Sequence, residues 1–168
     1  MLHLLFPRLT ATRERGAELF RAVTERARAT HWYVAGAVPD TVDGRFAMLA
    51  TITALVLVRL ERDGDEGHAV SVALTERFVA AMEAEHREMG MGDPSLGRTV
   101  RKLVGSLARR VELWRGVAVE GWDDAAHESV YGRDAQAGAL SHTAHALARF
   151  RRDLEAAPLE ALAEGRIG

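Results

Sequence analysis

Residues 46–60, FAMLATITALVLVRL, decide the fold class of this chain. Arg59 carries the only charge in the segment, and apolar side chains would lie nearly all round a helix built from it. A helix without a polar face usually forms the buried centre of a bundle. The longest apolar run, Met48–Val58, is well short of the roughly 20 residues that span a bilayer. We therefore predict a buried central helix over about Arg45–Arg62, capped either by Asp43 or by Asp40 with Asp43 three residues on.

The sequence on both sides of this segment also favours helices. Apolar residues recur three or four positions apart, and glycine or proline interrupts the pattern. The expected helices cover about Thr12–Thr30, His68–Met89, Pro94–Val119 (capped by Asp93), Asp123–Tyr131 and Ala135–Ala156, followed by a short turn after Pro158 and a frayed tail at residues 163–168. No segment alternates as a strand does, and no long repeat recurs. The sequence predicts an all-α fold: one domain over residues 1–168, a bundle of about six helices with a buried apolar second helix.

Composition narrows the function classes. The chain has 168 residues, a formal net charge of −2 and no cysteine, which excludes disulfides, cysteine-bound metal and thiol nucleophiles. We expect no DNA partner and a cytoplasmic protein, because the chain offers neither a polycationic composition nor a signal peptide. The N-terminal apolar segment, residues 1–11, is expected to dock on the core, with contact to a membrane surface or a partner as the alternative; its apolar residues are Leu2, Leu4, Leu5, Phe6 and Leu9.

Histidine and carboxylate pairs raise the question of a metal site. Glu83 and His86, Asp124 and His127, and His142 and His145 are each three residues apart, which places both members of a pair on one helical face. A di-iron bundle also needs inward carboxylates from two further helices, which this chain does not offer, and no Gly-rich phosphate loop or nucleophile motif is present. We expect no metal, no cofactor and no enzymatic activity; a di-iron carboxylate enzyme is the remote alternative.

Positive charge is concentrated in one predicted helix. Residues 97–115 hold six basic side chains and one acid, a net charge of +5, which leaves −7 for the rest of a chain whose total is −2. The candidate docking residues are Arg98, Arg101, Lys102 and Arg109, of which Arg98, Lys102 and Arg109 share one stripe. This stripe is either an ordinary solvated face or a docking surface for an acidic partner, RNA phosphate or anionic lipid headgroups.

The connector HWYVAGAVPDTVDGRF, residues 31–46, carries more aromatic and charged chemistry than a link between two helices needs. Its rings could simply close one end of the bundle, and its Asp residues could be helix caps. Aromatic rings with polar tips beside Arg and Asp are also typical of protein interfaces. The pattern alone leaves both interpretations open.

The chain resembles the ubiquinol–cytochrome c chaperone family over roughly Leu9–Leu162. The blocks that carry the resemblance are His31-Trp32-Tyr33, Val38-Pro39-Asp40-Thr41, Asp43-Gly44-Arg45-Phe46 and Arg87-Glu88-Met89-Gly90-Met91-Gly92-Asp93, in that order, with weaker matches at Gly97-Arg98-x-Val100-Arg101-Lys102 and Val130-Tyr131. Two positions depart from the family pattern: His86 replaces a more usual aliphatic residue, and Ser129 replaces a common Asn. The chain is similar to the compact bacterial members.

The resemblance implies a non-enzymatic assembly chaperone that binds cytochrome b and supports assembly of ubiquinol–cytochrome c reductase. A helical adaptor without a chaperone role is the alternative. Mitochondrial members act with a partner protein near the ribosome, so a ribosome or small-partner contact and a peripheral position at the inner face of the bacterial plasma membrane stay open. We expect the connector and the turn at residues 87–93 to lie side by side as the client surface, formed by His31, Trp32, Tyr33, Pro39, Asp40, Asp43, Arg45, Phe46, Arg87, Glu88, Met89 and Asp93.

Overall fold

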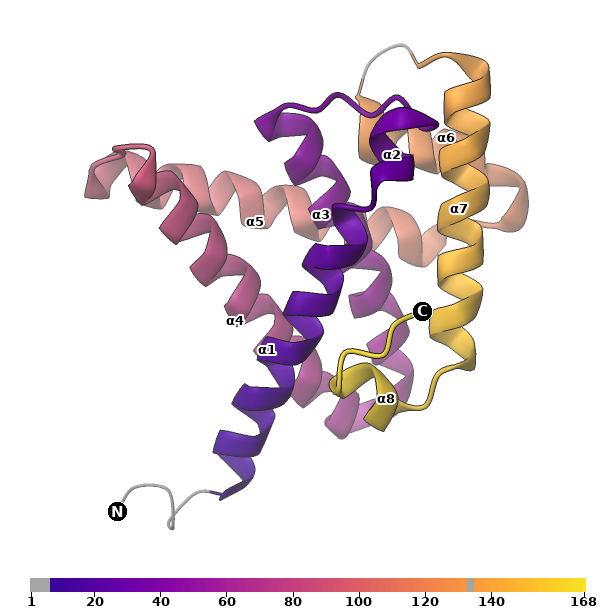
Figure 1. Ribbon diagram of the computed structural model, residues 1–168. Coiled ribbons are helices and arrows are strands. Elements are labelled where there is room, and N and C mark those ends of the chain that lie inside the picture. The colour runs from indigo at the N-terminus through magenta and orange to yellow at the C-terminus, as the bar shows by residue number, and fades with distance from the viewer. Residues whose placement is uncertain (1–6, 133–134) are drawn as a thin grey trace.

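The computed structural model describes residues 7–132 and 135–168, and within these ranges the chain forms helices and no strand (Figure 1). The long helices are α1 (Pro7–Ala27), α3 (Val42–Leu60), α4 (Gly64–Glu88), α5 (Asp93–Gly116) and α7 (Ala137–Ala156). The short ones are α2 (Thr30–Val34), α6 (Trp122–Ala126) and α8 (Leu159–Ala163), with 3₁₀ turns at Glu61–Asp63 and Val119–Gly121 and a π-helical turn at His127–Tyr131. The predicted all-α fold is confirmed.

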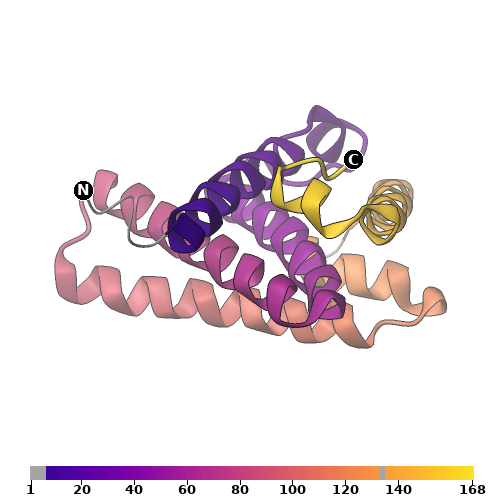
Figure 2. The same ribbon diagram turned by 90° about the horizontal axis from the view of Figure 1, so that it is seen from below.

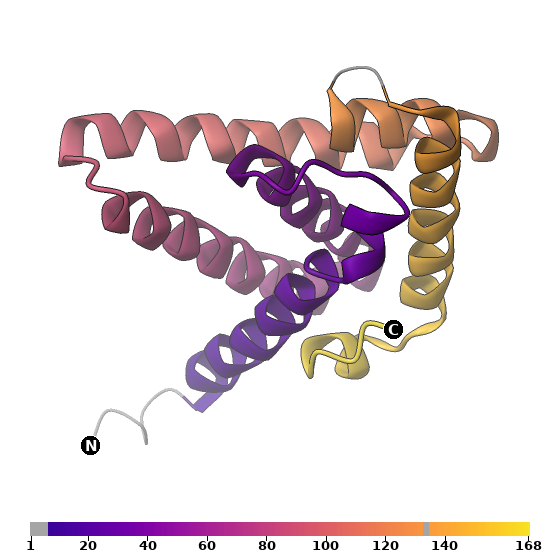
Figure 3. The ribbon, with the colours of Figure 1, turned by 45° about the horizontal axis from the view of Figure 1, so that its top comes forward.

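Helix α3 is the centre of the molecule, as its apolar sequence predicts. It contacts α1, α4, α5, α7 and the π-helical turn. Met48, Ile52 and Leu60 are fully buried, and Thr51 and Thr53 are buried with their hydroxyls bonded to carbonyls one turn back. Figure 3 shows α4 and α5 diverging from their shared turn with α3 between them, and α7 standing across the far end of α5. Seen from below, α5 forms one long outer edge of the molecule (Figure 2).

The helix boundaries correct several sequence expectations. Helix α1 begins at Pro7 rather than Thr12, because proline fits the first turn of a helix, where its missing N–H has no partner to lose. Neither Asp40 nor Asp43 caps α3; the Thr41 hydroxyl accepts a hydrogen bond from the Gly44 N–H at 3.2 Å. Helix α5 has Gly92 rather than Asp93 at its N-cap, and Asp93 is its first helical residue.

The C-terminal tail is docked, so the prediction that residues 163–168 fray is wrong. Leu162 and Ile167 are buried in the core, and the Arg26 guanidinium donates to the carbonyl of Gly168 at 3.3 Å. Ile167 is apolar, so burying its side chain stabilises the docked tail through the hydrophobic effect. The expected docking of Leu2, Leu4, Leu5 and Phe6 lies outside the described residues. No helix in the described part of the chain is both long and apolar enough to cross a membrane.

Candidate functional site

A groove of about 470 Å³ opens beside the start of α3. Its walls come from the end of α1, from α2 and the loop after it, from the first turns of α3, from the last turns of α4 and from one residue of α5. The lining residues are Thr24, Ala27, Arg28, Tyr33, Asp40, Thr41, Val42, Asp43, Arg45, Phe46, Leu49, Met82, Glu85, His86 and Leu103. Segments far apart in the sequence therefore converge on the connector that the sequence singled out.

The aromatic rings at the start of the connector hold the end of α1. Trp32 Nε1 donates to the carbonyl of Arg26 at 2.8 Å, and the Tyr33 hydroxyl donates to the carbonyl of Ala27 at 2.9 Å. Carbonyls in the last turn of a helix have no partner within the helix, so these rings supply partners for them. Trp32 is fully buried, which overturns its expected role as an exposed client contact. Tyr33 holds the end of α1 and also lines the groove. Its partial burial raises the pKa of its hydroxyl.

A second set of hydrogen bonds fixes the middle of the connector to α7. The Tyr131 hydroxyl donates to the carbonyl of Gly36 at 2.5 Å and lies 2.8 Å from the Thr143 hydroxyl. Thr143 is fully buried, and Gly36 packs so tightly that a Cβ there would meet the Thr143 hydroxyl at 2.6 Å. Tyr131 belongs to the weaker family block Val130-Tyr131, but its sequence context does not indicate this hydrogen bond.

Charged groups surround the mouth of the groove. Arg45 Nε donates to Asp40 Oδ1 at 2.6 Å, and both side chains are more than 60% exposed, at 64% and 62%. Their hydrogen bond lowers the pKa of the Asp40 carboxyl and raises the pKa of the Arg45 guanidinium, which also lies near Glu85. This pair keeps its polar atoms in water and contributes little to stability, since exposed ion pairs are screened.

The floor of the groove is apolar. Phe46, Leu49, Met82 and Leu103 line it, and each is partly or fully buried. The ring of Phe46 lies 6.2 Å from that of the buried Phe78, and the Arg110 guanidinium lies 5.8 Å above it. Methionine adapts to varied apolar shapes, because its side chain is unbranched and flexible. An apolar floor with a mixed-charge rim is suited to hold an apolar segment whose flanks are polar.

The other predicted client residues lie outside the groove. Pro39 is exposed beside it, and the exposed stretch Arg87, Glu88 and Met89, with Asp93, lies beyond His86, the last groove residue of α4. Gly90, with φ +85°, ends α4 there, and the turn forms the tip of the molecule in Figures 1 and 3. In the groove, α4 meets the connector through Met82, Glu85 and His86, and none of residues 87–93 lines it.

His31 also points away from the groove. Its Nδ1 lies 3.1 Å from Nε2 of His142 on α7, so one imidazole donates to the other. Burial lowers the pKa of His31, and the neighbouring His142, Arg26 and Arg149 lower it further. His31 therefore belongs to the contact between α2 and α7.

Paired histidines and carboxylates do not form a metal centre in the described residues, where no three such side chains converge. His86 Nδ1 bonds to the Met82 carbonyl at 2.8 Å, and His145 Nδ1 lies 2.7 Å from the Ser141 carbonyl. Each imidazole is thus engaged by its own helix. Neither geometry resembles a ligand set.

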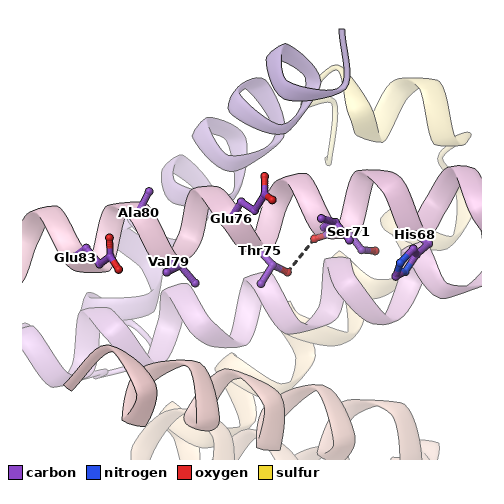
Figure 4. Close-up of a pocket in the computed structure, with 8 residues that line it drawn as sticks. His68, Ser71, Thr75, Glu76, Val79, Ala80 and Glu83 are labelled. Carbon is purple, nitrogen blue, oxygen red and sulfur yellow. Dashed lines mark hydrogen bonds between the residues drawn. The ribbon is translucent and has the colours of Figure 1, made fainter. Parts of the chain in front are cut away.

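A second hollow, of about 520 Å³, lies along the outer face of α4 (Figure 4). Its described lining comes from α4 alone: His68, Ser71, Val72, Thr75, Glu76, Val79, Ala80 and Glu83. The polar side chains in Figure 4 spread along the helix, and the Thr75 hydroxyl donates to the Ser71 carbonyl at 2.8 Å. Sequence reasoning did not single out this strip, and its groups do not converge on a ligand position.

Known proteins resemble this chain in both sequence and fold. The family model for ubiquinol–cytochrome C chaperones matches residues 35–167, which is most of the chain. This chain belongs to the ubiquinol–cytochrome c chaperone family. Its fold is similar to the crystal structure of the Cbp3 homolog from Brucella abortus, with a TM-score of 0.76 and 23% identity over 100% of this chain and 96% of that chain. No curated protein sequence matches it. The resemblance read from the sequence is confirmed, and family membership supports a chaperone role.

Proposed function

We propose that this member of the ubiquinol–cytochrome c chaperone family is a non-catalytic assembly factor that holds cytochrome b in the groove beside α3. Cytochrome b is the membrane subunit of ubiquinol–cytochrome c reductase, and holding it would support assembly of that enzyme. The protein would do this at the cytoplasmic side of the bacterial plasma membrane. Any ribosome or small-partner contact would use surfaces outside the groove.

The observation that carries the proposal is the groove itself. It combines an apolar floor, built on Phe46, Leu49 and Met82, with the charged rim of Asp40 and Arg45. A newly made membrane protein exposes apolar segments bounded by polar residues, and these two kinds of surface would match them. Val42, at the mouth, is apolar and 55% exposed, so its side chain is accessible to a bound apolar segment.

A capture experiment tests the proposal. Val42→Asp with Arg45→Ala changes the mouth of the groove and keeps the fold, because both side chains are exposed and an acid suits the first turn of α3. The matched control is Val72→Asp with Arg62→Ala, since Val72 is an exposed valine of α4 outside the groove. We expect the groove variant to recover about tenfold less cytochrome b from cells, the effect of losing about 1.4 kcal/mol of contact.

Equal recovery by the groove variant and the control would reject the groove as the client site. Deleting the gene separates the chaperone from the adaptor alternative. If the reductase assembles fully without this protein, the adaptor is favoured and the chaperone proposal fails.

A further inference from the structure

Four exposed basic side chains lie along the outer face of α5: Arg98, Arg101, Lys102 and Arg109, here called the basic stripe. Arg101 and Lys102 lie three and four residues after Arg98, and Arg109 lies seven after Lys102, so all four share one side of the helix. Together with Gly105 they border a shallow hollow. From Arg98 to Arg109 the stripe extends for about 16 Å at the rise of an α-helix.

Among the described residues, no carboxylate forms an ion pair with this stripe. The acid that follows on the same face, Glu112, lies 2.5 Å from Nη1 of Arg115, whose Nη2 contacts Glu61 at 2.5 Å. Because Arg115 holds the nearby acids, the basic stripe keeps its full positive charge.

Glycines flatten the helix surface along the stripe, and its own sequence contains no aromatic residue. Gly97 and Gly105 leave gaps between the basic residues, and the nearest described atoms to a Cβ placed there are Nη1 of Arg101 at 3.8 Å and Nη1 of Arg109 at 3.9 Å. These guanidinium groups therefore lie along the helix rather than away from it. No aromatic side chain lies between Arg98 and Arg109. Helix α5 forms an outer edge of the molecule, where a broad surface can reach it (Figures 2 and 3).

We propose that the basic stripe binds the headgroup phosphates of a membrane surface rich in anionic phospholipid. A bilayer presents a plane of phosphates, and four cations along one side of an exposed helix can each reach that plane. Clusters of four to eight basic residues on an amphipathic helix are typical of such contacts, each adding about 1 kcal/mol. Proteins that bind single-stranded RNA usually combine a basic groove with stacking rings, and the segment Arg98–Arg109 contains no aromatic residue.

The stripe lies beside the client groove. Leu103 lines the groove and directly follows Lys102, and successive helical residues are about 100° apart around the axis. A molecule bound through the stripe would therefore hold the groove close to the bilayer surface, where a membrane-inserted client emerges. The placing of the groove near its client rests on the proposed function, whereas lipid binding by the stripe does not.

Vesicle co-sedimentation of the full chain tests the proposal. We expect binding to vesicles of phosphatidylcholine with phosphatidylglycerol, loss of binding in high salt, and no binding to pure phosphatidylcholine. Arg98→Glu with Lys102→Glu should weaken partitioning at least about thirtyfold, from two contacts of about 1 kcal/mol each. Arg62→Glu with Arg152→Glu, exposed residues on other elements, changes net charge equally and should bind as the unaltered chain does.

Three results would overturn the proposal: equal weakening by both charge-reversal variants, salt-insensitive binding, or binding to RNA oligonucleotides or polyglutamate without binding to anionic vesicles. The groove variant Val42→Asp with Arg45→Ala should still bind anionic vesicles. The lipid result is therefore independent of whether the groove captures cytochrome b.

Discussion

The hydroxyl of Tyr131 lies 2.5 Å from the carbonyl oxygen of Gly36, although the two residues are 95 positions apart in the chain. The same hydroxyl lies 2.8 Å from Thr143 on α7. This contact attaches the connector to the π-helical turn and to α7. The shape of the groove therefore depends on a residue that does not line it.

Removing the Tyr131 hydroxyl should loosen this attachment. Tyr131→Phe keeps the ring but leaves the Gly36 carbonyl and the buried Thr143 hydroxyl without this partner. We expect the free energy of unfolding to fall by about 1–2 kcal/mol, the usual effect of losing a buried hydrogen bond. Urea denaturation measures the change, and an unaltered midpoint would show that the contact contributes nothing.

Gly44 sets how closely the connector passes the first turn of α3. A Cβ at this position would lie 1.9 Å from the Pro39 carbonyl oxygen, and a backbone atom cannot move aside cheaply. We expect Gly44→Ala to lower the melting temperature clearly. Gly105→Ala, in the middle of α5 and 3.9 Å from its nearest described neighbour, should instead add about 0.5–1 kcal/mol through helix propensity. Stabilisation by both substitutions would contradict the close approach.

The His31–His142 contact predicts a dependence of stability on pH. The pKa of His31 in the folded chain is lowered from its ordinary value of 6.5, first by burial and then by His142 and nearby arginines. The unfolded chain therefore takes up a proton at a higher pH than the folded chain does, and stability falls as pH drops below about 6.5. His31→Gln should flatten the fall in unfolding free energy between neutral and mildly acidic pH. An equally steep fall in the variant would contradict this origin.

Ser129, in the π-helical turn, joins three elements. Its hydroxyl accepts from Trp114 Nε1 at 3.1 Å and lies 2.6 Å from the hydroxyl of Thr51, and both partners are fully buried. Ser129→Ala leaves the Trp114 N–H without an acceptor, so we expect a loss of about 1–3 kcal/mol in chemical denaturation. Ser71→Ala on α4, whose hydroxyl donates to the Gly67 carbonyl of the same helix, should change stability by much less. Equal losses in the two variants would contradict this role for Ser129.

The spacing of apolar residues and the hydrophobicity of residues 46–60 were sufficient to predict the all-α fold. The buried α3 followed from residues 46–60, because an apolar surface on all sides has only one stable location. Helix ends were less predictable, since Thr41, Asp40 and Asp43 are all acceptable caps and tertiary contacts choose among them. Ile167 shows the same limit: one apolar residue in a polar tail gives no periodic signal, yet it reaches the core.

The site was predictable only in part. Asp40, Asp43, Arg45 and Phe46 line the groove as the connector suggested. Trp32 does not line the groove. Sequence alone does not distinguish a ring that donates a hydrogen bond to a helix end from a ring that binds a partner. The contributions of Met82 and Leu103 depend on how α4 and α5 cross α3, which local patterns do not specify.

Site-specific photo-crosslinking from position 42 in cells that make cytochrome b tests the central claim most directly. The photoreactive residue replaces Val42 at the mouth of the groove, and the comparison chain carries it in place of Val72 on α4. We predict a crosslink to cytochrome b from position 42 and none from position 72. Crosslinks of equal yield from both positions, or none from position 42, would contradict the account.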